Sequence, residues 1–204
     1  MEQSMENKKV VLVGYGTLLL QESLGHTVGA NGAESKKYKP IIIKDYRRLF
    51  NLLPDHYEAD NRLFADDREK GAANIEPAKG IHFNGLCFEA DATDLENLDK
   101  RERYYKRSKV PYFDFETGAN LGECHVYESP LDARWLVSDN EKLLPLWRDI
   151  VYARVGAYRI SEAFGKMYDD STYLGDGKTL MIDYYKDHLQ ALEDLESVLL
   201  QYKK

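Results

Sequence analysis

The hydrophobic pattern of the chain begins with a short apolar run at residues 9–14, which is rich in β-branched residues and is stopped by a glycine. Such a run is typical of a strand that is buried on both faces. Residues 79–89 alternate between apolar and polar positions and predict a second strand. Similar but shorter runs predict strands at residues 41–43, 48–53, 62–65, 72–75, 108–113 and 123–127.

Helical patterns occupy the middle and the end of the chain. Thr93 and Glu96 have the spacing of a capping box, which predicts a helix from there to about Arg103. From Asp139 onward the pattern is helical, and residues 184–202 carry six apolar residues at helical spacing, namely Leu189, Leu192, Leu195, Val198, Leu199 and Tyr202. Residues 25–35 are rich in glycine without periodicity and predict a surface loop.

This order of elements predicts an α+β fold. Strands come first, with one internal helix, and helices follow late, so that a mixed sheet can curl into a small β-barrel with flanking helices. A chain of 204 residues fits one domain. We expect a flexible N-terminus at residues 1–8 and a single domain over 9–204, in which 139–204 form a mostly helical extension.

Composition and charge narrow the possible partners. The net charge is −7, and lysine and arginine are scattered, so we expect neither nucleic acid nor a membrane as a partner. No apolar stretch approaches 18 residues and no secretory signal is visible, so we expect a cytoplasmic protein. Cys87 and Cys124 lie in strand-like segments and predict buried, reduced thiols. The five histidines lack metal-binding spacing, so no metal centre is expected.

Glu102 is the first candidate for chemistry. Its helical phase places it on the apolar stripe with Leu95 and Leu98, whereas Arg101 falls on the opposite side with other charged residues. A carboxylate on an apolar stripe is expected to have either a charged or hydrogen-bonding partner or a function, because desolvation raises its pKa and disfavours the charged form. The residues leave two structural alternatives open: a buried ion pair with Arg103 or Arg107, or a head group at the edge of the stripe in solvent.

The loop after the first strand is the second candidate. Gly14 and Gly16 let the backbone turn tightly and leave N–H groups that could hold a carboxylate or a developing oxyanion. The loop is no P-loop, since no Gly-Lys-Ser/Thr follows it, and it lacks the third glycine of a dinucleotide fingerprint, which is replaced by Leu19. A simple turn remains the alternative interpretation.

Together these segments resemble gamma-glutamylcyclotransferase-like and AIG2-like proteins. Those proteins carry a Y-G-S/T-L or Y-G-S-N loop and a later segment of the type L-D-x-x-E-x-x-Y-x-R-x-x-V. The matching residues of this chain are Tyr15, Gly16, Thr17 and Leu18 in the loop, and Leu98, Asp99, Glu102, Tyr105, Arg107 and Val110 in the segment. The resemblance covers roughly residues 10–130. It implies that Glu102 is the catalytic acid/base and that Tyr15, Gly16, Thr17, Leu18 and Tyr105 bind the substrate.

The activity that this resemblance implies is an intramolecular cyclotransfer, which releases 5-oxoproline from a gamma-glutamyl derivative. It needs no cofactor and no metal, and its partner is a small-molecule gamma-glutamyl substrate. Leu18 stands where the better-known gamma-glutamylcyclotransferases have asparagine, so the leaving amine stays open, as does the oligomeric state. Two alternatives remain: a non-catalytic binding module with the same cavity, and an acyl-removing enzyme of a biosynthetic pathway.

Overall fold

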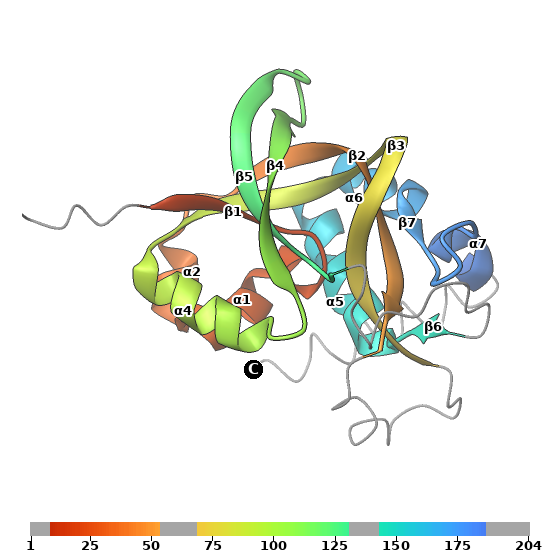
Figure 1. Cartoon of the computed structure of the whole chain (residues 1–204), viewed down its shortest axis with the longest axis horizontal. Helices are drawn as coiled ribbons and strands as arrows, with labels where there is room; N and C mark the ends of the chain where they lie inside the picture. The colour runs from red at the N-terminus through yellow and green to blue at the C-terminus, as the bar shows by residue number, and fades with distance from the viewer. Residues whose placement is uncertain (1–8, 54–68, 131–142, 187–204) are drawn as a thin grey trace, which may run out of the picture.

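The computed structural model describes residues 9–53, 69–130 and 143–186 (Figure 1). Its elements follow in the order β1 (Val10–Gly14), η1 (Thr17–Leu19), α1 (Gln21–Val28), α2 (Ala30–Glu34), β2 (Lys39–Leu52), β3 (Glu69–Ala90), α4 (Ala92–Arg101), β4 (Lys106–Asp114), β5 (Asn120–Glu128), β6 (Leu144–Pro145), α5 (Trp147–Ile160), α6 (Glu162–Asp170), β7 (Thr172–Tyr173) and α7 (Met181–Tyr185). The expected α+β class is confirmed.

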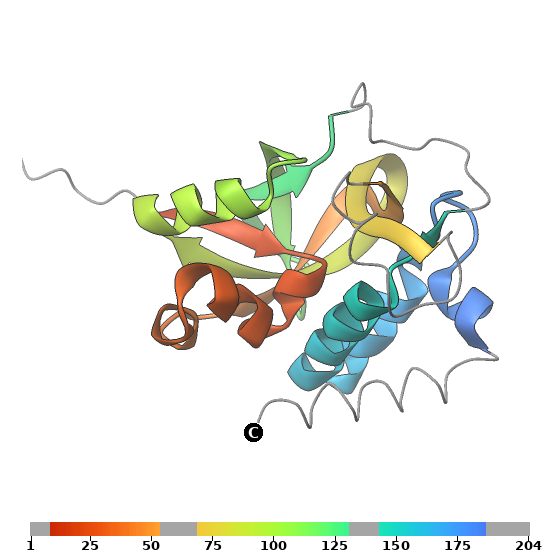
Figure 2. The same cartoon turned by 90° about the horizontal axis from the view of Figure 1, so that it is seen from below.

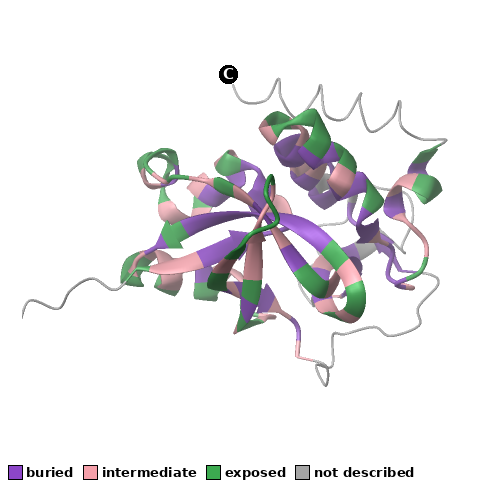
Figure 3. Ribbon diagram, turned by 90° about the horizontal axis from the view of Figure 1, so that it is seen from above, coloured by how far each residue is buried: buried purple, intermediate pink, exposed green. Residues whose placement is uncertain are grey.

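Five of the strands form a closed ring. The strand order is β6-β3-β1-β5-β4-β2-β7, and β2 additionally pairs with β3, which joins the two ends of the run β3-β1-β5-β4-β2. β1 and β5 are parallel, while the other pairs in this ring are antiparallel. The ring is therefore the small mixed barrel that the sequence predicts. The turn between β4 and β5 and the bend of β3 are exposed (Figure 3).

The two longest strands, β2 and β3, leave the barrel at a shared bend. Asp45 adopts a left-handed backbone with φ 61°, Gly80 opposite it has φ 81°, and the Gly80 N–H donates to Asp45 Oδ1 at 2.8 Å. The pairing register shifts at this point, between Lys44 and Tyr46. Beyond the bend β2 pairs with β7 and β3 pairs with β6. The same two strands thus form part of the barrel on one side of the bend and pack with the C-terminal part of the chain on the other.

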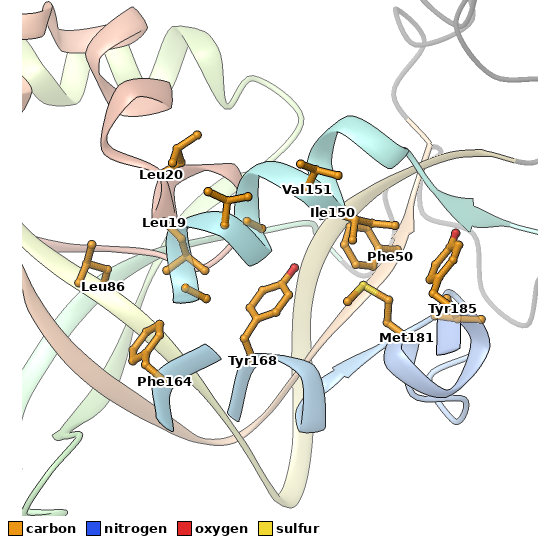
Figure 4. Close-up of a cluster of buried hydrophobic side chains, with 14 of the residues drawn as sticks. Leu19, Leu20, Phe50, Leu86, Ile150, Val151, Phe164, Tyr168, Met181 and Tyr185 are labelled. Carbon is orange, nitrogen blue, oxygen red and sulfur yellow. The ribbon is translucent and has the colours of Figure 1, made fainter. Parts of the chain in front are cut away.

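Helices pack against both ends of this sheet. α1, α2 and α4 lie at one end, and α5 and α6 lie side by side at the other (Figures 1 and 2). One core fills the barrel and includes Ile41, Phe83, Val110 and Val126. A second core lies under α1, α2 and α4 and includes Leu12, Leu24, Phe88 and Leu98. The third joins η1 and the strands to α5–α7 through Leu19, Leu20, Phe50, Ile150, Phe164, Tyr168 and Met181 (Figure 4).

Two local predictions are wrong. The expected loop at residues 25–35 contains the second half of α1 and all of α2, separated by Gly29 with φ 82°. These short helices are stabilised by the burial of Leu24 and Ala33 in the core, which overrides the weak local propensity. The capping box of α4 is formed by Asp91 and Asp94, so this helix begins at Ala92 and ends at Arg101, two residues before the expected end.

The C-terminal part is mainly helical over its described residues, but it also contributes two short strands. β6 and β7 each add two residues to the edges of the sheet, which the helical pattern from residue 139 onward does not reveal. The expected long helix at residues 184–202 is described only over 184–186, where α7 ends. The rest of that helix, the short strand at 62–65 and the N-terminal segment 1–8 lie outside the described residues. Cys87 and Cys124 are free and buried, as expected.

Candidate active site

A cavity of about 510 Å³ opens where the loop after β1 meets the end of α4. The loop contributes residues 14–18 to its wall, and the α4 end contributes Arg101, Glu102 and Tyr105. The remaining wall comes from α1, from the beginning of β3, from β5 and from α5. Glu102 and the glycine loop are 86 residues apart in sequence, and both line this one cavity.

The loop lines the cavity mainly with its backbone, because its apolar side chains point into the hydrophobic cores. Leu19 N–H donates to the Gly16 carbonyl and Leu20 N–H to the Thr17 carbonyl, which makes the 3-10 turn η1. Among the described residues no acceptor takes a hydrogen bond from the N–H groups of Gly16, Thr17 or Leu18. Three successive residues of the cavity wall therefore have N–H groups without an acceptor among the described residues.

Tyr15 and Leu18 anchor this loop. The Tyr15 ring lies in the barrel core in edge contact with Phe83, and its hydroxyl donates to the Tyr127 carbonyl at 2.6 Å. Leu18 is 7% exposed and packs in the core under α1 and α4. A Cβ on Gly14 would come within 2.7 Å of the Leu18 Cβ, so the chain folds back too closely for any side chain there. Gly14 is thus required by close packing, without a positive φ.

Glu102 caps the C-terminal end of α4 and lies in the cavity wall with 17% of its side chain exposed. Its Oε1 lies 3.1 Å from Arg101 Nε. Burial raises the pKa of the Glu102 carboxyl above its usual value, the Arg101 cation opposes this rise, and Asp149 adds to it. A partly buried acid with a raised pKa binds a proton more readily than an ordinary carboxylate, which suits it to accept and return one.

The partner of Glu102 differs from both sequence alternatives. Arg107 pairs with Asp99 at 3.2 Å, and Arg103 lies over the ring of Tyr104. Arg101 is the partner, although its helical phase predicts the opposite side. The phase locates a Cα atom, and the long arginine side chain extends from there toward the loop and α1.

The comparisons with known proteins identify the fold. No protein-family model and no curated protein matches the sequence. A solved gamma-glutamyl cyclotransferase superposes with a TM-score of 0.56 at 15% identity, over 79% of this chain and 86% of that chain. A yeast gamma-glutamyl cyclotransferase described as specific to glutathione gives 0.55 at 12%, over 81% and 98%. An uncharacterized human protein gives 0.55 at 17%, over 78% and 86%.

The chain has the gamma-glutamylcyclotransferase-like fold. At these identities the similarity establishes the fold and leaves the activity to be argued from the site. None of the described helices has the length and apolar character that crossing a membrane requires.

Within this gamma-glutamylcyclotransferase-like fold Tyr105 also reaches the cavity. Its hydroxyl donates to the Ala73 carbonyl at 2.6 Å, which ties the segment after α4 to the start of β3. Tyr127 of β5 lines the cavity and donates to Asp99 Oδ1 at 2.7 Å. All six site residues expected from the sequence, namely Glu102, Tyr15, Gly16, Thr17, Leu18 and Tyr105, therefore lie around one cavity. Their roles in binding and catalysis remain predictions.

Sequence reasoning missed the contribution of α5. Asp149 and Tyr152 come from this helix and line the cavity, and Asp149 is 6% exposed. No local motif marks Asp149; it reaches the site because α5 packs against η1 and brings Gly156 against the backbone of Leu19. His26 of α1 is a further ionisable residue in the wall of the cavity. Over the described residues, no cluster of three or more acidic, histidine or cysteine side chains could hold a metal.

A buried arginine supports the loop from behind. Arg48 of β2 is fully buried and donates to the carbonyls of Tyr15 at 3.1 Å and of Asn84 at 2.9 Å. Its Nε donates to Thr172 Oγ1 at 2.8 Å, and its guanidinium lies over the Tyr168 ring. Burial lowers the pKa of Arg48 to about 10, which leaves it protonated at neutral pH. Arg48 thereby connects the glycine loop to the C-terminal segment.

Proposed function

We propose that this protein is an intramolecular cyclotransferase, which cleaves a gamma-glutamyl amide and releases 5-oxoproline. The observation that supports the proposal is that Glu102 and residues 16–18, whose N–H groups have no acceptor among the described residues, line one cavity. A carboxyl group that can exchange a proton and donors that can stabilise an oxyanion are the two requirements of this reaction.

The reaction needs no protein nucleophile. The Glu102 carboxylate takes a proton from the α-ammonium group of the substrate, and the free amine attacks the γ-carbonyl carbon. A five-membered ring forms, and the carbonyl oxygen carries negative charge that the loop N–H groups stabilise. The ring nitrogen still carries two protons after the attack. As the carbonyl re-forms and the bond to the leaving amine breaks, Glu102 returns its proton to that amine, and the ring nitrogen gives up its second proton, which also ends on the leaving amine. The products are 5-oxoproline and the amine in its ammonium form, and no water is consumed.

The surroundings of Glu102 support this role. An α-ammonium group is a much weaker acid than a carboxylic acid, so a base whose pKa lies above that of an ordinary carboxylate is better matched to its proton. Burial raises the Glu102 pKa in this direction. Holding the substrate folded for ring closure can contribute roughly 7–11 kcal/mol, and general acid–base catalysis a factor of roughly 10²–10⁴.

The fold is compatible with this chemistry, because two similar structures are described as gamma-glutamyl cyclotransferases. Glutathione is named for the yeast protein, and we do not transfer that substrate to this chain. The proposed partner is a small gamma-glutamyl compound, acted on in the cytoplasm.

The test is the release of 5-oxoproline by the purified protein from gamma-glutamyl amino acids, gamma-glutamyl-lysine and glutathione, identified by mass spectrometry. We expect turnover of at least one compound, and a loss of roughly 10²–10⁴-fold in kcat for Glu102→Gln. Glu96→Gln is the matched control, because Glu96 lies on the same helix with 68% of its side chain exposed. The proposal fails if wild type and Glu102→Gln release the same amount from every compound.

A further inference from the structure

Arg101 uses all four terminal N–H groups of its guanidinium at the cavity. Nη1 donates to the Ser23 carbonyl and to Thr27 Oγ1, both at 2.8 Å. Nη2 donates to Thr17 Oγ1 at 2.9 Å and to Ser23 Oγ at 3.0 Å. Nε lies 3.1 Å from Glu102 Oε1, which makes an ion pair with the carboxylate. A guanidinium has five donors in one plane, and four of them are used in these hydrogen bonds.

These five contacts connect three segments that are distant in sequence. Thr17 belongs to the glycine loop, Ser23 and Thr27 to α1, and Glu102 to the end of α4. Because the guanidinium fork is rigid and planar, fixing four of its donors on the loop and α1 also fixes the place of its positive charge beside the Glu102 carboxylate. Only 26% of the Arg101 side chain is exposed, which further limits its motion.

We propose that Arg101 is a positioning residue, whose guanidinium holds the Glu102 carboxylate at a fixed place relative to the glycine loop after β1. Arg101 does not bind the substrate carboxylate in this arrangement, since its four terminal donors are already committed. The expected effect of Arg101 on kcat rests on the proposed function. Its expected effect on the Glu102 carboxylate does not.

The charge of Arg101 and its shape have separable effects. The cation favours the ionised form of Glu102, against burial and against the negative charge of Asp149 from α5. The other ionisable groups facing the cavity are His26 of α1 and tyrosines from the loop, the α4 end, β5 and α5, namely Tyr15, Tyr104, Tyr105, Tyr127 and Tyr152. Lysine keeps the charge without the fork, and methionine removes both.

We therefore compare Arg101→Lys with Arg101→Met. For Arg101→Lys we expect kcat to fall roughly 10–100-fold, because a displacement of the catalytic group by about 1 Å can cost 10²-fold in rate. KM should change little, and the acidic limb of the pH–rate profile should stay at its wild-type pH. For Arg101→Met we expect a similar or larger loss of kcat, and an acidic limb moved to higher pH because the Glu102 pKa rises without its cation. Lys100→Met is the matched control, since Lys100 is exposed and pairs only with Glu96 among the described residues.

A carbon-13 NMR titration of the Glu102 carboxyl group separates this inference from the proposed function, because it needs no substrate. The Glu102 pKa should be higher in Arg101→Met than in wild type, even if no compound is turned over. Circular dichroism verifies that each variant is folded, and if Arg101→Met does not fold, Arg101→Lys carries the test through kcat. An unchanged Glu102 pKa in folded Arg101→Met, or wild-type kcat in Arg101→Lys, overturns the assignment.

Discussion

Replacing the buried Arg48 by methionine tests how the glycine loop is held in place. The change removes the donor from six acceptors. Three of them keep other hydrogen bonds, namely Thr172 Oγ1, Ser171 Oγ and the Tyr168 carbonyl. The other three are the Tyr15 carbonyl, the Asn84 carbonyl and Asn84 Oδ1, at 3.1, 2.9 and 3.1 Å. A buried polar group left without a partner costs about 1–3 kcal/mol. We use the lower end of this range for each acceptor that is left without a donor, because removing the cation also removes the free-energy cost of burying its charge. The expected loss is about 3 kcal/mol, or roughly 6–12 °C in Tm for a chain of this length.

Equilibrium unfolding in urea and a thermal scan measure this loss. Arg47→Met is the matched control, because Arg47 is the neighbouring residue and is likewise hydrogen-bonded, to Glu76 and to the Gly177 carbonyl, but 32% of its side chain is exposed. We expect the control to lose about 1 kcal/mol or less. If Arg48→Met unfolds within about 1 kcal/mol of wild type, Arg48 does not support the loop as described.

Two further changes test the loop and the second acid of the cavity. Gly14→Ala should cost about 1–3 kcal/mol in the free energy of urea unfolding, because its Cβ meets the Leu18 Cβ at 2.7 Å; wild-type stability contradicts this packing. Asp149→Asn removes a negative charge that raises the Glu102 pKa. The Glu102 pKa should therefore fall, and the acidic limb of the pH–rate profile should move to lower pH, opposite to Arg101→Met; a shift upward or none contradicts this.

The barrel and the two main site segments can be predicted from the sequence because their signals are local. The run that forms β1 is apolar and β-branched and ends at Gly14, and the apolar phase of α4 places Glu102 inward. Each signal lies within about ten residues of chain. The resemblance then links the two segments, which local patterns alone cannot connect.

The missed features depend on tertiary contacts. α1 has few apolar residues, and it is held by the burial of Leu24 and by Arg101, which donates hydrogen bonds to the carbonyl and hydroxyl oxygens of Ser23. Asp149 reaches the cavity only through the packing of α5 on η1. Neither contact leaves a periodic pattern in the sequence, because each joins segments more than 75 residues apart. The same holds for the direction of the Arg101 side chain.

The central claim is that Glu102 and the N–H groups of residues 16–18 act on the same molecule. A crystal structure of the protein with 5-oxoproline tests it most directly. We predict that the ring occupies the cavity of about 510 Å³, with its N–H facing the Glu102 carboxylate. Its ring carbonyl oxygen should lie about 2.7–3.1 Å from at least one loop nitrogen. Binding of 5-oxoproline elsewhere, or in the cavity with Glu102 turned away from the ring, would contradict the account.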